Sequence, residues 1–231
     1  LPYESCNLGS INVARCVVNN GKSVSVDYEL LKDITYKAVH FLDNVIDVNN
    51  YPLPIIGEKT KANRKIGLGI MGFADMLIAL GIPYDSEAAL GVAKNIMSAI
   101  QDASKEASRA LAKERGAFPN FPLSEYAHNG DEPLRNATTT TIAPTGTISI
   151  IAGTSSGVEP IFALAYVRNV LDNSRLIESN PLFVEYCKER GLYTDELMQK
   201  VAQTGSVAHI EELPEDVRAL FVTAHDIAPE W

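Results

Sequence analysis

The feature that most constrains the fold of this chain is a long amphipathic stretch from Ser86 to Arg115. Its apolar residues recur every three or four positions, which predicts one helix with a single buried side: Leu90, Ala93, Met97, Ile100, Ala107 and Leu111. Gly116 stands where a glycine commonly follows the last helical turn. The opposite side carries charged residues and is typical of a solvated surface, so this helix is expected to cover other elements with its apolar side only.

Other helices are predicted along most of the chain. Asp27 can cap a helix that continues to about Val48, and another helix is expected from Phe73. Three more are predicted towards the end of the chain: Pro181–Arg190, Thr194–Gln203 and Pro214 to about Ala224. Pro52 and Pro54 are expected to end regular structure between the first two helices.

Short strands are predicted between the helices, at three apolar or β-branched segments: Asn12–Val18, Thr138–Ile142 and Phe162–Leu171. A turn at residues 19–22 should join the first of these to a strand containing Val24 and Val26. Residues 148–152 fit either a short strand or the first turn of a helix. This alternation of helices with short strands predicts a mixed α/β domain.

The composition excludes several classes of protein. The 231 residues, of which 46% are hydrophobic and 21% charged, suit one large globular domain or two small ones. A net charge of -9 without any basic run argues against a nucleic-acid or anionic-membrane surface. No apolar stretch approaches the roughly 20 residues that span a bilayer, and no signal peptide opens the chain. Three cysteines without a CxxC pair favour a reducing cytoplasm, and no metal-ligand spacing is present.

Residues 67–72 match the G-x-G-x-x-G pattern of dinucleotide-binding proteins. That mechanism needs a buried strand before the glycines and a helix N-terminus aimed at pyrophosphate. The preceding residues 61–65 are polar and charged, so the required strand is missing. We therefore interpret these glycines as positions of close packing between a strand and a helix.

The segment from Thr138 to Ser149 is a better candidate for binding an anion. A β-branched run enters a tight turn, in which Pro144 fixes φ and Gly146 can adopt a positive φ. Successive backbone amides can then converge on a phosphate, helped by three hydroxyl groups: those of Thr145, Thr147 and Ser149. Residues 153–157 could form part of the same cavity wall. From physical reasoning alone, an ordinary Thr-rich edge strand followed by a turn explains the pattern equally well.

Cys6 is the one cysteine in a polar, glycine-containing setting, although a lone cysteine is more often a small buried hydrophobe than a reactive group. Cys16 and Cys187 lie in apolar or helical surroundings and are expected to be structural. The four histidines are scattered and form no legible catalytic or metal-binding arrangement: His40, His128, His209 and His225.

Five segments of the sequence resemble consecutive landmarks of ribonucleotide reductase catalytic chains: residues 5–12, 64–75, 136–149, 155–160 and 224–227. They occur in the order of that family and spread over essentially the whole chain. The Pro-Thr-Gly-Thr-Ile-Ser form of residues 144–149, with the following residues 150–153, is most similar to the class II, adenosylcobalamin-dependent enzymes. Class I large subunits are the near alternative.

The resemblance implies an α/β fold, namely the second half of a ten-stranded α/β barrel of the ribonucleotide reductase type. Residues 1–231 would be part of one such catalytic barrel domain, truncated at both ends. The implied activity is radical-based reduction of ribonucleotides, expected to be diphosphates, to 2'-deoxyribonucleotides for DNA synthesis. The implied cofactor is adenosylcobalamin, whose full site is not expected within this chain.

The resemblance also assigns roles to residues. Cys6 matches one member of the cysteine pair that supplies two electrons, which an external dithiol such as thioredoxin would later restore. The loop that binds the substrate phosphates matches five residues: Pro144, Thr145, Gly146, Thr147 and Ile148. No metal ligand, nucleic acid or membrane is implied, and a homodimeric parent is left open.

The radical cysteine of the family lies a few residues before the position that Cys6 matches, so it would precede this chain together with the partner of Cys6. The isolated chain is therefore expected to be inactive, and formation of deoxynucleotide by it would contradict this. A non-catalytic nucleotide-binding module that keeps the phosphate loop is the alternative of a different class. An Asn-x-Cys-x-Glu motif immediately upstream in the full-length gene would favour the enzyme.

Overall fold

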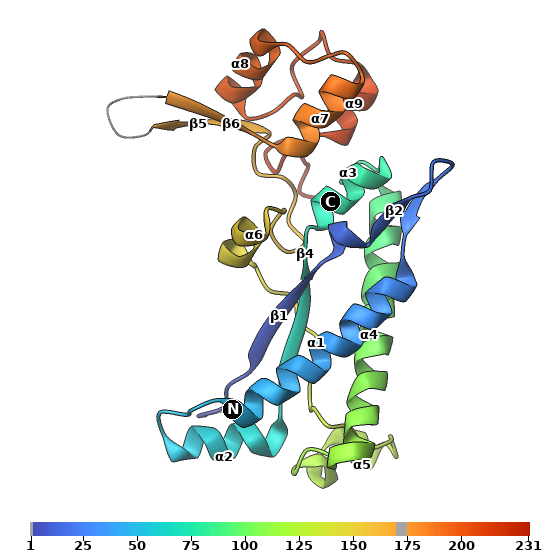
Figure 1. Ribbon diagram of the computed structural model, residues 1–231, viewed down its shortest axis with the longest axis vertical. Helices are drawn as coiled ribbons and strands as arrows, with labels where there is room; N and C mark the ends of the chain where they lie inside the picture. The colour runs from blue at the N-terminus through green and yellow to red at the C-terminus, as the bar shows by residue number, and fades with distance from the viewer. Residues whose placement is uncertain (1, 170–174) are drawn as a thin grey trace.

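The computed structural model describes residues 2–169 and 175–231 (Figure 1). Its strands pair two by two. β1 (Asn7–Asn12) is parallel to β4 (Ile66–Met71), with Asn7 opposite Ile66. β2 (Val17–Asn19) and β3 (Val24–Val26) form an antiparallel hairpin, as do β5 (Ala165–Asn169) and β6 (Arg175–Ser179). The predicted α/β fold is confirmed, and the described residues do not close a barrel.

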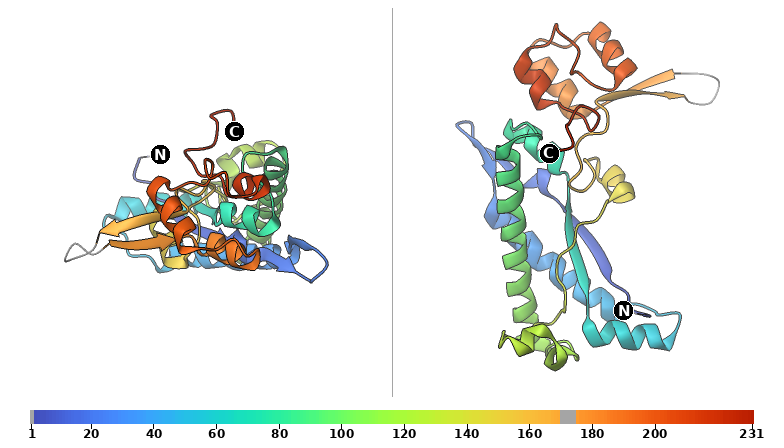
Figure 2. Two further views of the ribbon diagram at one scale, coloured as in Figure 1. Left: turned by 90° about the horizontal axis from the view of Figure 1, so that it is seen from above. Right: turned by 180° about the vertical axis from the view of Figure 1, so that it is seen from behind.

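Two long helices cover one side of the β1–β4 pair. They are α1 (Tyr28–Val48) and α4 (Glu87–Arg115), and Figures 1 and 2 show them on the side of the strands opposite to α6 (Gly146–Ala152). The helix starts follow from capping: an Asp27 carboxylate oxygen accepts from the Leu30 amide at 2.9 Å, and the Ser86 hydroxyl accepts from the Ala89 amide at 3.2 Å. Both predicted helices are confirmed, and each begins at the residue that follows its capping residue.

The core between these helices and strands is built from fully buried aliphatic residues. Burying each such side chain contributes roughly 1.5–3 kcal/mol. The set comes from α1, β4 and α4: Leu31, Val39, Ile46, Ile66, Leu68, Ile70, Ile96 and Ile100. On α4, Ile100, Ala107 and Leu111 are buried as predicted, but Leu90 is 49% exposed. Ala89 lies on the buried side in its place, because the contact face begins one residue earlier.

A second core lies in the C-terminal lobe, beyond the end of the β1–β4 pair (Figure 1). Its helices are α7 (Pro181–Glu189), α8 (Asp195–Thr204) and α9 (Glu215–Leu220), so the last ends earlier than predicted. The rings of Phe183 and Phe221 stack edge to face in its centre, with 5.1 Å between their centroids. Helix α3 (Phe73–Leu80) reaches both cores, since Ala74 and Ile78 belong to this one.

The predictions for residues 12–18 and for Pro54 are wrong, each for a local reason. The expected strand at residues 12–18 is interrupted by a 3-10 turn, η1 (Val13–Cys16), because the Asn12 side chain accepts from the Ala14 amide at 3.2 Å and turns the chain. Pro54 begins helix α2 (Pro54–Asn63) instead of ending regular structure, since the first helical position needs no amide hydrogen.

The remaining segments follow the sequence more loosely. Residues 138–142 run beside β4, and the Leu68 amide donates to the Thr139 carbonyl at 2.9 Å, but only one bridge forms and no regular strand. Threonine hydroxyls of this segment bond to α4 instead. Short helical turns η2 (Phe121–Leu123) and α5 (Glu125–His128) interrupt the loop-rich region that follows α4. The strand expected at residues 162–171 is present as β5, and its last two residues lie outside the described part.

Candidate functional site

Two glycines of the G-x-G-x-x-G pattern, Gly67 and Gly69, lie inside β4, and Gly72 follows this strand at the start of α3. A Cβ at Gly67 would lie 2.8 Å from a Leu8 methyl group, and one at Gly69 would lie 2.9 Å from the Thr141 carbonyl oxygen. The missing side chains therefore let β1 and residues 138–142 approach β4 closely. The predicted close packing is present at Gly67 and Gly69, but it brings extended segments together and not a strand and a helix.

The turn predicted to bind phosphate leads into α6, which resolves the open choice at residues 148–152 in favour of a helix. The left-handed residue of the turn is Thr145, with φ 56° and ψ 23°, whereas Gly146 has no positive φ and is the first helical residue. The expectation of a positive φ at Gly146 is therefore wrong. Thr145 is only 8% exposed, because its hydroxyl is turned inward and accepts from the Gly157 amide at 2.7 Å.

The start of α6 faces solvent. Pro144, Gly146, Thr147 and Ile148 are exposed, and no side chain among the described residues caps the helix. Ser149 is buried and its hydroxyl lies 2.9 Å from that of Ser156. Of the three hydroxyl groups expected to help an anion, those of Thr145 and Ser149 are thus engaged within the protein. The backbone amides and the Thr147 hydroxyl remain on the open side.

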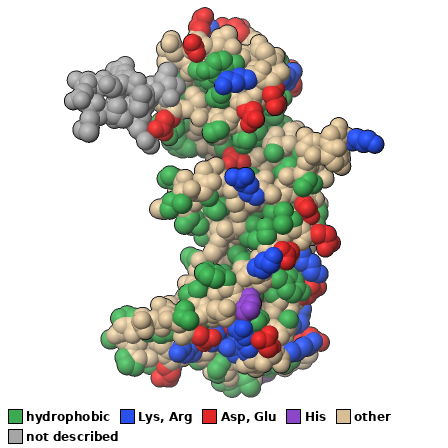
Figure 3. All heavy atoms as spheres, in the orientation of Figure 1, with side chains coloured by type: hydrophobic (Ala, Val, Ile, Leu, Met, Phe, Trp, Pro, Cys, Tyr) green, Lys and Arg blue, Asp and Glu red, His purple; other side chains and the backbone are tan. Residues whose placement is uncertain are grey.

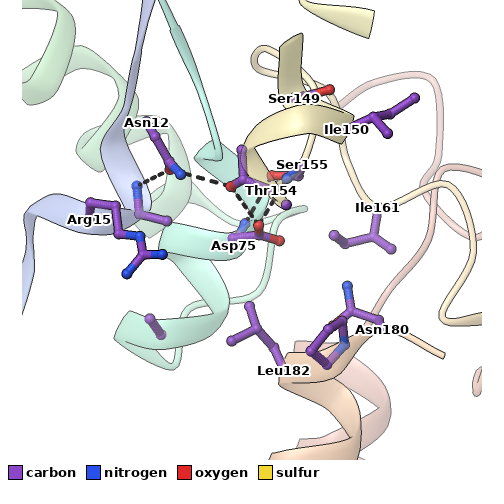
Figure 4. A pocket seen from close by; sticks show the side chains of 14 residues that line it. Asn12, Arg15, Asp75, Ser149, Ile150, Thr154, Ser155, Ile161, Asn180 and Leu182 are labelled. Atoms are coloured by element: carbon purple, nitrogen blue, oxygen red, sulfur yellow. Dashed lines mark hydrogen bonds between the residues drawn. The ribbon is translucent and has the colours of Figure 1, made fainter. Parts of the chain in front are cut away.

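A polar junction lies at the carboxyl ends of β1 and β4, where α3 begins (Figure 4). The Asp75 carboxylate accepts from the Thr154 hydroxyl at 2.7 Å and from the Ser155 amide at 2.8 Å. The Asn12 side chain accepts from the same Thr154 hydroxyl at 3.3 Å. Gly72, with φ 78°, leaves room for this contact, since a Cβ there would lie 2.6 Å from the Thr154 hydroxyl oxygen.

A cavity of about 500 Å³ opens beside this junction (Figure 4). Polar groups of Asn12, Arg15 and Asp75 line one part of it, and apolar residues of α6 and α7 line the rest. Residues 153–155 also line it, but the expectation that residues 153–157 form a wall of the same cavity as the phosphate turn is not confirmed. The cavity lies at the far end of α6 from the predicted phosphate turn, and none of residues 144–148 lines it.

Cys6 directly precedes β1, at the opposite end of the strand pair from the junction. It is exposed, and its Sγ lies 3.5 Å from the Asn7 carbonyl oxygen. Partial desolvation raises the pKa of the Cys6 thiol, Lys65 opposes this shift, and Glu4 adds to it. The Lys65 Nζ is itself paired with a Glu4 carboxylate oxygen at 3.0 Å. The thiol form of Cys6 therefore predominates at neutral pH.

Cys16 and Cys187 are fully buried, and burial raises the pKa of each thiol. Both belong to hydrophobic cores. All three cysteines are free. Within residues 2–169 and 175–231, no three His, Cys, Asp or Glu side chains are grouped so that they could hold a metal ion.

Sequence reasoning missed Asp75 and Asn12 as parts of a site. Both lie within segments already recognised as landmarks, yet their partners Thr154 and Ser155 are far away in the sequence. The available signal for Asp75 was its position in the first turn of a helix that begins at a glycine without a capping side chain.

Comparison with known proteins gives consistent matches along the chain. The family described as "Ribonucleotide reductase, barrel domain" matches residues 1–133 and 129–231. A vitamin B12-dependent ribonucleoside-diphosphate reductase of Thermoplasma acidophilum is 54% identical over all 231 residues, which are 29% of that protein. The protein of the same name from Mycobacterium tuberculosis is 53% identical over all of this chain and 32% of its own length.

More distant matches carry a different name. The ribonucleoside-diphosphate reductase subunit alpha of Chlamydia pneumoniae is 32% identical over 98% of this chain and 25% of its own length. Among solved structures, the class Id ribonucleotide reductase alpha subunit of Actinobacillus ureae is 26% identical, with a TM-score of 0.73 over 94% of this chain and 38% of that chain. The chain thus spans about a third of the length of the curated relatives named first.

Proposed function

Since this chain belongs to the ribonucleotide reductase barrel-domain family, we propose that it is part of the catalytic chain of a reductase that converts ribonucleoside diphosphates to 2'-deoxyribonucleotides for DNA synthesis. The observation that carries the proposal is the identity of 53–54% over the whole chain to two proteins named ribonucleoside-diphosphate reductases. Residues 1–231 are taken as part of one barrel domain, working in a reducing cytoplasm. No described helix is both long and apolar enough to cross a membrane.

The proposed class is the adenosylcobalamin-dependent one, because the relatives at 53–54% identity are named vitamin B12-dependent, whereas the alpha subunit from Chlamydia is 32% identical. The described residues do not provide a complete site for this cofactor. The cavity of about 500 Å³ is much smaller than a corrinoid. The chemistry of the bound cofactor would be to start the radical reaction, and the roles below concern only groups of this chain.

Cys6 is proposed to be one of two thiols that reduce the substrate. The C2'–O bond breaks, the oxygen leaves as water, and a hydrogen takes its place at C2'. The two thiols lose two electrons and two protons and become a disulfide, which an external dithiol such as thioredoxin reduces again. The raised pKa of Cys6 supports this role, because the protonated thiol is the form that can give up hydrogen.

The turn from Pro144 to Ile148 is proposed to bind the phosphates of the substrate. The start of α6 carries partial positive charge and leaves the first amides of the helix open to solvent. Because the Thr145 hydroxyl is bonded to Gly157, the proposed contacts are the backbone amides and the Thr147 hydroxyl. No net positive charge is required for such a site.

The two proposed elements lie along one pair of strands. The backbone of Ala143 passes beside Gly69, which is opposite Ser10 on β1. Ser10 is four residues from Cys6, or about 13 Å at the usual rise of a strand. The reduced carbon of a nucleoside diphosphate belongs to the same sugar that carries the phosphates, so both proposed elements would act on one substrate that lies along these strands.

The experiment that tests this function uses the full-length protein. With adenosylcobalamin and a dithiol it should form deoxynucleotide from a nucleoside diphosphate, and Cys6→Ser should abolish deoxynucleotide formation, a single turnover included, while leaving diphosphate binding intact. Asp102→Ala, on the solvated side of α4, is the control that should keep activity. Wild-type turnover by Cys6→Ser would overturn the role of Cys6. Activity that needs a metal-containing second subunit and no adenosylcobalamin would assign the protein to class I.

A further inference from the structure

Residues 153–157 act as a strap between two helices that are far apart in the sequence. The strap follows α6 and crosses to the first turn of α3. It begins and ends at glycines in the left-handed region, Gly153 with φ 63° and Gly157 with φ 48°. A Cβ at Gly157 would lie 2.8 Å from the Ala143 carbonyl oxygen, so the strap packs directly against the turn that precedes α6.

One end of the strap is bonded to α3. Helix α3 starts at Gly72, which has no side chain to cap it, and Ser155 supplies the cap from 80 residues away. The Ser155 hydroxyl accepts from the Asp75 amide at 3.2 Å, and the Ser155 carbonyl accepts from the Gly72 amide at 2.8 Å. In return, the Asp75 carboxylate accepts from the Ser155 amide and the Thr154 hydroxyl. This is the reciprocal pattern of a capping box, formed between two distant segments.

The other end of the strap is bonded to α6. The Gly157 amide donates to the Thr145 hydroxyl at 2.7 Å, and the Ser156 and Ser149 hydroxyls are 2.9 Å apart. The Thr154 amide also donates to the Ser149 carbonyl at 3.0 Å. Every residue from Thr154 to Gly157 is therefore fixed, towards Asp75 on one side and towards the turn and α6 on the other.

Asp75 holds this arrangement in place because it is buried and charged. It is 8% exposed, and it lies in the first turn of α3, where the helix dipole favours a carboxylate. One carboxylate oxygen accepts both strap donors, and hydrogen bonds to a charged acceptor are stronger than those between neutral groups. Without that acceptor, the Ser155 amide would lose its partner, and the Thr154 hydroxyl would keep only its longer bond to Asn12.

We propose that Asp75 is a positioning residue for the phosphate-binding turn, acting through the 153–157 strap to hold Thr145 in its left-handed conformation and the first amides of α6 in place for a diphosphate. Asp75 itself does not touch the substrate. The proposal rests on the function proposed above, in which residues 144–148 bind the phosphates.

The test compares two ligands on the full-length protein: a nucleoside diphosphate and the corresponding nucleoside. Asp75→Ala should weaken binding of the diphosphate by about tenfold or more, because the lost interactions are charge-assisted. Binding of the nucleoside, which does not reach the turn, should stay within about twofold. In turnover, KM for the diphosphate should rise more than kcat falls. Asp75→Asn, whose amide oxygen can still accept from Ser155 and Thr154, should restore most of the diphosphate affinity.

Two further variants keep the test decisive if Asp75→Ala does not fold. Thr154→Val removes one donor to Asp75 at similar volume and should give a smaller loss, again for the diphosphate only. Asp102→Ala is the control for loss of a carboxylate and should change neither affinity. The positioning role would be overturned if the variants bound both ligands equally more weakly, or if diphosphate binding were unchanged in Asp75→Ala and in Thr154→Val. A wild-type protein that binds diphosphate no better than nucleoside would instead overturn the proposed phosphate turn itself.

Discussion

The two ends of the β1–β4 pair are both held by buried carboxylates, but they are built differently. At the amino-terminal end of β4, Asp43 of α1 is fully buried and accepts from Arg64 Nε at 2.9 Å, from Asn136 Nδ2 at 2.9 Å and from Arg135 Nε at 3.3 Å. At the carboxyl end, the donors to Asp75 among the described residues are a hydroxyl and a backbone amide. Figure 3 shows Lys and Arg side chains denser at the first end than around α6.

This difference suggests that the first end contributes mainly to the stability of the fold and the second mainly to the position of the turn before α6. The Arg64 guanidinium makes its hydrogen bonds within the protein, because it also donates to the Asp47 carboxylate at 2.8 and 2.9 Å and to the Asp43 carbonyl at 3.0 Å. That cluster joins α1, the end of α2 just before β4, and the segment after α4. The Asp75 junction lies beside a cavity of about 500 Å³ and is linked to an exposed helix start. We expect damage at the first end to unfold the protein and damage at the second to displace a turn.

The largest effect is expected from Asp43→Ala. It removes the buried carboxylate that pairs with Arg64 and Arg135, so that Arg64 keeps only its bonds to Asp47 and to the backbone carbonyl of residue 43, and breaking a buried ion pair costs about 3–5 kcal/mol. Thermal unfolding of the full-length protein should show this as a large fall in Tm. The matched control is Asp33→Ala on the same helix, where an exposed pair with Lys37 at 2.7 Å should be worth well under 1 kcal/mol. Equal stability of the two variants would contradict the comparison.

The junction end is tested by two glycines in the left-handed region. Gly72→Ala places a Cβ against Thr154 and Asn12 at the strap, whereas Gly81→Ala, with φ 72° at the other end of α3, meets nothing within 4 Å. In both variants the free energy of unfolding should fall by about 1 kcal/mol, because alanine is strained in the left-handed conformation. In Gly72→Ala it should fall by about a further 1–3 kcal/mol, because the new Cβ is crowded. Only Gly72→Ala should also weaken diphosphate binding. If Gly81→Ala weakens it equally, the strap is not the cause.

The smallest effect concerns pH at the charged end. The hydrogen bonds from Arg64 lower the pKa of Asp47 below its ordinary value of 3.8 against the opposing effect of burial. A lowered folded-state pKa contributes stability above the unfolded value, and that contribution is lost as the pH falls through the folded one. Asp47→Asn should therefore be slightly less stable than wild type near neutral pH, and the gap should close below about pH 4. Urea unfolding at several pH values measures it; a gap that widens on acidification would contradict it.

The sequence predicted what is decided locally. Helices α1 and α4 follow from caps and periodicity within their own residues, and the hairpin of β2 and β3 follows from its turn. Asn12 interrupts a predicted strand because its side chain can accept from a backbone amide two residues on, which turns the chain. Pro54 starts a helix because a proline can stand either after the end of a helix or at its first position.

The site was predicted less completely, for a physical reason. Thr145 takes the left-handed conformation in place of Gly146 because Gly157 bonds to its hydroxyl, 12 residues away. The role of Asp75 depends on Ser155, 80 residues away. Such contacts form only when the folded chain brings distant residues together, so a local sequence pattern does not predict them. The proposed roles of Cys6 and of the phosphate turn came from family resemblance, with the physics of the residues leaving alternatives open.

Helix α3 is shared by the two hydrophobic cores, and this has a mechanical consequence. Met76 and Leu77 are clamped in the core under α1 and α4, while Ala74 and Ile78 are embedded in the C-terminal lobe. Because α3 is packed into both cores, it cannot rotate relative to one of them without disturbing the other. A tilt of the C-terminal lobe would therefore also move α3 and Asp75, and with them the strap.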